Sequence, residues 1–224
     1  IAGVVAPDLQ CSADEVIFEN EFLYNKDKSK QLSFNEAIRL MYNRQEYPYS
    51  FGVFQAPKVS WDEHTGQGNA YFTWVYGCQA VELKVNAKSG QITLLNMWAA
   101  HDVGKAVNPE MLKGQFYGGM AMGAGYGILE SCDVNGGKVV PTNFHQYRIL
   151  RSTDLPEMTA IIVENHDPLS PSGAKGIGEP TNEIMAPAIA NAVFRATGKR
   201  FPNQPIKIFE EKETQRHRET EQKL

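Results

Sequence analysis

A glycine-dense segment in the middle of the chain constrains the fold more than any other feature of the sequence. Asn108 is a favourable N-cap and Pro109 suits the first helical position, so the sequence predicts a helix that begins there. Five glycines follow Gln115 inside this helix: Gly118, Gly119, Gly123, Gly125 and Gly127. Each interior glycine costs about 1 kcal/mol relative to alanine. The run therefore predicts a helix face pressed against another backbone or against a flat ligand.

A second glycine-rich segment, residues 172–180, places one carboxylate directly before a helix. Its three glycines lie within six residues and leave backbone amides accessible to a bulky ligand. Glu179 is the only acid of the segment, and Pro180 suits the first position of a helix that we expect from Thr181 to Thr197, ended by Gly198. A carboxylate near a helix start is stabilised by roughly 0.3 to 1 kcal/mol. Glu179 is therefore either a helix cap or a group that faces a ligand.

The order of residues in this segment excludes two common nucleotide-binding loops. A phosphate-binding loop needs Gly-Lys followed by Ser or Thr, whereas Gly176 follows Lys175 here. A dinucleotide fingerprint needs a tight turn after a strand. Residues 158–164 predict a strand, but residues 165–172 form a polar connection that contains proline.

The remaining pattern favours an α+β fold with a mixed sheet and packed helices, in two layers. Residues 71–85 and 91–100 predict two strands joined by a hairpin. Ser33 and Glu36 form a capping box for a helix that ends near Arg44. We expect three regions: 1–68 as a partial N-terminal region, 69–209 as a C-terminal domain, and 210–224 as a charged tail.

Composition narrows the function classes. The net charge is −4, so the chain lacks the excess of basic residues that is typical of nucleic-acid-binding proteins. No apolar run is long enough to span a membrane. The three cysteines and five histidines show no metal-ligand spacing, so we expect no metal held by protein side chains. These features favour a soluble, cytoplasmic protein that binds neither nucleic acid nor membrane.

Six segments, in order along the chain, together resemble the molybdenum hydroxylases of the xanthine oxidase and aldehyde oxidoreductase family, in the C-terminal part of the molybdenum-binding subunit. The segments are residues 76–90, 102–109, 114–119, 147–156, 173–180 and 186–192. Each is weak alone, but six in register are specific. The resemblance implies that residues 69–209 are a molybdenum cofactor-binding domain and that residues 1–68 are a fragment of the preceding half.

The resemblance also implies a cofactor, a reaction and site residues. The cofactor is a molybdopterin, and the sequence leaves open whether it has the cytosine dinucleotide form. The acid at Glu179 is the catalytic base in oxidative hydroxylation of an N-heterocycle or an aldehyde, with water as the oxygen source. The residues implied to bind the cofactor are Gln115, Gly118, Gly119, Lys175, Gly176, Ile177 and Gly178. The chain departs from the family at Met122, where many relatives have a second glutamine.

The same resemblance implies that this chain acts only with partners. Iron–sulfur clusters and FAD are expected on partner subunits or domains, and further segments of the molybdenum subunit are expected to contact the small-molecule substrate, so we expect a hetero-oligomer. The sequence does not distinguish a natural subunit from a fragment. Two alternatives remain: a non-catalytic phosphate- or nucleotide-binding module with Glu179 as a helix cap, and a structural subunit whose glycines serve packing.

Overall fold

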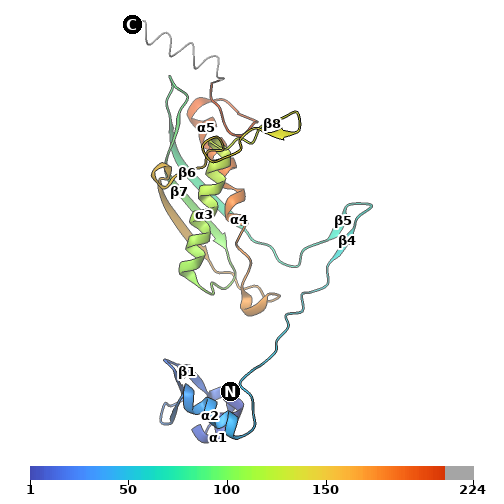
Figure 1. The fold of residues 1–224 in the computed structure, drawn as a ribbon, viewed down its shortest axis with the longest axis vertical. Helices are drawn as coiled ribbons and strands as arrows, with labels where there is room; N and C mark the ends of the chain where they lie inside the picture. Colours follow the sequence, from blue (N-terminus) through green and yellow to red (C-terminus); the bar gives the residue numbers. More distant parts are fainter. Residues whose placement is uncertain (210–224) are drawn as a thin grey trace. The chain divides into compact units, whose positions relative to one another are not determined.

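The computed structural model describes residues 1–209 and divides the chain into two compact units, Ile1–Gln55 and Ala56–Leu224 (Figure 1). The charged tail predicted for residues 210–224 lies outside the described residues. The boundary predicted between residues 68 and 69 stays a prediction.

The first unit packs two helices with a small antiparallel sheet. Its elements are α1 (Ala2–Leu9), a 3-10 turn (Ala13–Glu15), β1 (Ile17–Glu19), β2 (Phe22–Tyr24), β3 (Gln31–Ser33) and α2 (Phe34–Asn43). The predicted capping box is confirmed, because the Ser33 hydroxyl accepts from the Glu36 amide at 3.2 Å and the Glu36 carboxylate accepts from the Ser33 amide at 2.8 Å. The core of this unit consists of Val5, Leu9, Leu23 and Ala37.

The second unit is built on a three-stranded mixed sheet. The strand order is β10 (Glu157–Val163), β7 (Ile92–Asp102) and β6 (Gly77–Val85), with β6 antiparallel and β10 parallel to β7. The predicted hairpin and mixed sheet are therefore confirmed. The expectation that the first strand begins at Tyr71 is wrong, because β6 pairs only as far as Gly77 opposite His101. The Asp102 amide still donates to the Tyr76 carbonyl at 2.8 Å, but β7 ends at Asp102, so it offers no strand residue opposite those before Tyr76.

Three α-helices complete this unit within residues 56–209: α3 (Pro109–Ile128), α4 (Pro180–Glu183) and α5 (Met185–Thr197). Asn108 caps α3 as predicted, since its side chain accepts from the Met111 amide at 3.1 Å. The single helix expected over residues 181–197 is two helices. Pro187 has no N–H to donate to the Glu183 carbonyl, so the helical hydrogen bonding is interrupted there. Gly198 ends α5 at φ 72° as expected.

α3 packs on β7 and β10, and α5 packs on β6, so the helices lie against the sheet (Figure 1). The core between these layers consists of Leu94, Met97, Ala99, Val103, Phe116, Met120, Ala124, Ile177, Met185, Ile189, Val193 and Ile206. The unit also contains small elements: β4 (Ser60–Asp62) with β5 (Gln67–Asn69), β8 (Val134–Asn135) with β9 (Lys138–Val139), and 3-10 turns at Ser152–Asp154 and Pro171–Gly173. None of the helices in the described part of the chain has both the length and the apolar character needed to cross a membrane.

Candidate functional site

The two glycine-rich segments meet because α4 packs directly on α3. The Thr181 hydroxyl donates to the Gln115 carbonyl at 3.2 Å. A Cβ added at Gly119 would lie 2.0 Å from the Thr181 Oγ1, and one at Gly123 would lie 2.5 Å from the Asn182 carbonyl oxygen. No real Cβ tolerates such distances, so these two glycines let the helices approach closely.

The loop before α4 is fixed to the segment that follows β7. The Lys175 amide donates to the Val103 carbonyl at 2.9 Å, and the Lys105 amide donates to the Gly173 carbonyl at 2.7 Å. Gly104 lies between them at φ 62°, with its added Cβ only 2.1 Å from the Gly173 carbonyl oxygen. Glycine is therefore required at position 104 by both conformation and space.

A buried ion pair strengthens this attachment. The Lys175 Nζ lies 2.6 Å from the Asp102 Oδ2, and the two side chains are only 6% and 7% exposed. The same ammonium donates to the Trp74 carbonyl at 3.0 Å, and the Asp102 carboxylate accepts from the Gly104 amide at 3.0 Å. Burial is the largest single effect and would raise the pKa of Asp102, but the hydrogen bonds from Lys175, the Gly104 amide and Asn165, with the charge of Lys175, together hold that pKa below its usual value. The Lys175 side chain and backbone amide are thus both committed to holding the loop, which leaves only its backbone carbonyl for a ligand.

Next to this attachment the surface is hollowed by about 240 Å³. The lining comes from the segment after β7, the first turns of α3 and the late loop, and includes Lys105, Asn108, Met111, Gln115, Ala174 and Lys175. The structure therefore brings Gln115 and Lys175, two of the predicted site residues, to one hollow.

Glu179 occupies the N-cap position of α4 and is exposed. Its carbonyl accepts from the Asn182 amide at 2.9 Å, but its side chain makes no capping hydrogen bond. A cap stabilises a helix chiefly by accepting such a bond. The carboxylate is therefore not used in the way that the capping interpretation requires.

Four glycines of these segments differ from the packed ones. A Cβ added at Gly114, Gly118, Gly176 or Gly178 would meet no described atom within 4 Å, and none of the four has a positive φ. Neither packing within the described chain nor backbone conformation requires glycine at these positions. The backbone at these four positions is therefore open to the close approach of another group.

Two further predicted site residues, Ile177 and Gly119, are buried, whereas Met122 is exposed. Ile177 is 8% exposed and its side chain belongs to the core, so only its backbone can face a ligand. Gly119 is buried against Thr181. Met122, where the chain departs from the family, is 61% exposed, four residues after Gly118 on the same helix face.

Sequence reasoning missed three buried polar residues beneath this site, namely Gln79, His101 and Thr181, which are 9%, 1% and 0% exposed. A signal for Gln79 was present. The alternation of β6 places it on the inward face with Val81 and Leu83, where a polar side chain needs a partner.

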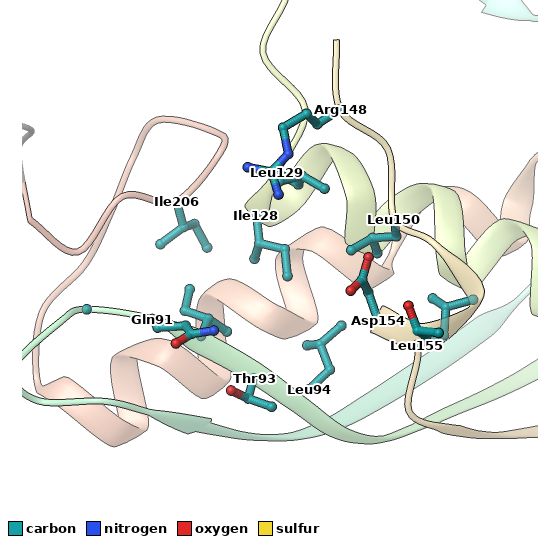
Figure 2. A pocket seen from close by; sticks show the side chains of 13 residues that line it. Gln91, Thr93, Leu94, Ile128, Leu129, Arg148, Leu150, Asp154, Leu155 and Ile206 are labelled. Carbon is teal, nitrogen blue, oxygen red and sulfur yellow. The ribbon is translucent and has the colours of Figure 1, made fainter. Parts of the chain in front are cut away.

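A larger hollow of about 520 Å³ lies elsewhere in this unit, between the start of β7, the end of α3 and residues 148–155 (Figure 2). Leu94, Ile128 and Ile206 are among its apolar lining residues, and Arg148 and Asp154 contribute charged groups. The Asp154 carboxylate accepts from Arg151 at 2.9 Å, and this hydrogen bond lowers its pKa to about 2. None of the residues that line this hollow is a predicted site residue. Within residues 1–209, no three His, Cys, Asp or Glu side chains gather as a metal-binding group.

Comparison with known proteins agrees with the resemblance. The model of the molybdopterin cofactor-binding domain family matches residues 1–156. The xanthine dehydrogenase molybdenum-binding subunit of Escherichia coli is 36% identical over 141 residues, which are 61% of this chain and 19% of that protein. The aldehyde oxidoreductase molybdenum-binding subunit of Escherichia coli is 34% identical over 131 residues, which are 57% of this chain and 18% of that protein.

The crystal structure of the aldehyde oxidoreductase from Desulfovibrio desulfuricans superposes with a TM-score of 0.63 and 28% identity, covering 72% of this chain and 18% of that one. The chain thus spans about a fifth of the length of the two curated relatives named above, 19% of one and 18% of the other. The chain belongs to the family of molybdopterin cofactor-binding domains and is similar to the molybdenum-binding subunits of xanthine dehydrogenases and aldehyde oxidoreductases.

Proposed function

We propose that this chain forms part of the cofactor site of a molybdenum hydroxylase, with Glu179 as the catalytic base. The reaction is oxidative hydroxylation of an N-heterocycle or an aldehyde, with water as the source of oxygen. The observation that carries the proposal is the exposed carboxylate of Glu179, which makes no capping hydrogen bond and follows Gly176 and Gly178, two glycines that packing within the described chain does not explain.

The residues available to hold the cofactor come from both glycine-rich segments. The Gln115 side chain borders the hollow beside the late loop, and Gly118 presents open backbone one turn away. Gly176 and Gly178 present open backbone from the late loop. Lys175 and Ile177 hold this loop in place with their side chains, so Lys175 offers only its backbone carbonyl and Ile177 only its backbone. Gly119 brings α4 against α3.

The bound molybdenum cofactor supplies a two-electron acceptor and activates water. The role of Glu179 is that of a general base, which accepts a proton on its carboxylate. A general base must lie within hydrogen-bond reach of the proton that it takes, and general acid–base catalysis contributes typically 10²- to 10⁴-fold. The hydrogen bonds of Thr181 to α3 and β6 fix the start of this short helix, and therefore the backbone from which the Glu179 carboxylate projects.

We infer that the whole enzyme includes the rest of a molybdenum-binding subunit, with iron–sulfur and flavin groups on partner subunits or domains. The support is the length comparison: the relatives are named as molybdenum-binding subunits, and the chain covers 19% or less of the two described above.

The direct test is Glu179→Gln in the assembled enzyme, assayed with xanthine and with benzaldehyde. Turnover of the substrate that the unmodified enzyme accepts should fall by about 10²- to 10⁴-fold, with molybdenum and pterin contents unchanged. Glu183→Gln is the matched control, because Glu183 is an exposed carboxylate on the same short helix. Turnover that survives Glu179→Gln with the cofactor loaded contradicts the base role. Saturable binding of ATP or CTP by molybdenum-free protein would instead support a nucleotide-binding module.

A further inference from the structure

The first turn of α4, which carries Glu179, is held from two sides through one residue. Thr181 is completely buried. Its hydroxyl donates to the Gln115 carbonyl on α3 at 3.2 Å, and its backbone carbonyl accepts from the Gln79 Nε2 on β6 at 2.7 Å. Since α4 has only four residues, these two hydrogen bonds fix much of its orientation.

The hydrogen bond to the Thr181 carbonyl depends on a histidine behind it. The Gln79 Nε2 also lies 2.9 Å from the His101 Nε2. A side-chain amide nitrogen only donates, so its two hydrogens go to the Thr181 carbonyl and to the His101 Nε2. His101 must then be neutral, with its proton on Nδ1. A flipped Gln79 amide would set its oxygen against the Thr181 carbonyl oxygen, which places two acceptors together.

The His101 ring is itself held tightly in place. It packs edge-on against Phe116 of α3, with ring centroids 5.3 Å apart. A Cβ added at Gly77 would lie 2.4 Å from the His101 Nδ1, so the opposite strand closes over the ring. Burial lowers the pKa of His101 and thereby favours its neutral form.

This arrangement is not optimised for stability. Among the residues that the structure describes, the Gln79 Oε1 and the His101 Nδ1 are buried and have no hydrogen-bond partner. Buried polar atoms without partners destabilise a fold, and each one in a native protein calls for an explanation. The arrangement that holds the Thr181 carbonyl in one direction explains why both of these atoms are left without a partner.

We propose that Gln79 and His101 are positioning residues for Glu179, acting through the carbonyl of Thr181. This inference rests on the proposed function of Glu179. His101 holds the Gln79 amide in the one orientation in which it donates to Thr181, and that hydrogen bond sets the direction in which α4 begins.

The test uses Gln79→Met in the assembled enzyme, which keeps the side-chain volume and removes both donors. The value of kcat should fall by roughly ten- to hundredfold with KM little changed, since small misplacements of a catalytic group have effects of this size. Amide hydrogen exchange at Thr181, Asn182 and Glu183 should accelerate. Gln91→Met, at an exposed glutamine beside β7, is the matched control and should change neither quantity.

A second variant, Gln79→Met with His101→Leu, separates positioning from stability. It removes the buried acceptor that the single variant leaves without a donor, so Tm should recover toward the unmodified value while kcat stays low. Recovery of kcat together with Tm, or unchanged kcat in Gln79→Met, overturns the positioning role. Glu179→Gln is measured in parallel. Turnover lost in Glu179→Gln but kept in Gln79→Met refutes only the positioning role, whereas turnover kept in Glu179→Gln refutes the base role itself.

Discussion

The two faces of α3 carry the same residue type for different physical reasons. On the buried face, Gly119 and Gly123 remove side chains that would collide with α4. On the exposed face, Gly114 and Gly118 have open space above them, and alanine there would stabilise the helix. The buried glycines therefore serve the fold, whereas the exposed ones lack an explanation within the described chain. On this difference we propose that a ligand covers the exposed face.

The largest expected effect concerns the buried face. Gly119→Val would place side-chain atoms where the Thr181 Oγ1 and backbone carbon lie, 2.0 Å and 2.8 Å from an added Cβ. Overpacking of this kind typically costs about 1 to 3 kcal/mol, occasionally more, and the contact with backbone favours the upper end. Urea denaturation should show this loss in the free energy of unfolding.

Gly118→Val is the matched control for that measurement, because nothing lies within 4 Å of an added Cβ at the adjacent position. Its free energy of unfolding should stay within about 0.5 kcal/mol of the unmodified protein. Equal destabilisation by the two substitutions would contradict the distinction between the faces.

A smaller effect, confined to acid pH, is expected from His101, which packs beneath the buried face. Burial lowers the pKa of His101 below the ordinary value of 6.5 in the folded protein. The unfolded chain then binds a proton that the folded chain does not, so stability should fall as pH drops below about 6.5. The free energy of unfolding between pH 5 and 8 checks this, with His101→Gln as the comparison. An acid slope that is the same in His101→Gln would assign the effect to other groups.

The contrast also shows which parts could be predicted from sequence. The start of α3 at Asn108 and Pro109 and the capping box at Ser33 follow from neighbouring residues, and both were predicted correctly. The start of β6 could not be predicted from its own residues, because it depends on where β7 ends. Residues 181–197 are divided between two helices because Pro187 has no N–H to donate to the Glu183 carbonyl. The sequence-based prediction of a single helix did not take this into account.

The candidate site shows the same limit. Sequence reasoning selected Glu179 and the glycines around it, and the structure brings their segments together. It did not separate Gly118 from Gly119, because only the packing of α4 on α3 decides which of the two is covered. It also missed Gln79 and His101, whose contact depends on the register between β6 and β7 and on the position of Thr181.

The central claim is that the exposed face of α3 lies against the molybdopterin. The most direct measurement is the molybdenum and pterin content of the assembled enzyme that carries Gly118→Val, with folding verified by an unchanged free energy of unfolding. The branched side chain should occupy the space of the cofactor, so we predict a folded enzyme that has lost most of its molybdenum and pterin. A folded Gly118→Val enzyme with full molybdenum and pterin contents would contradict the claim.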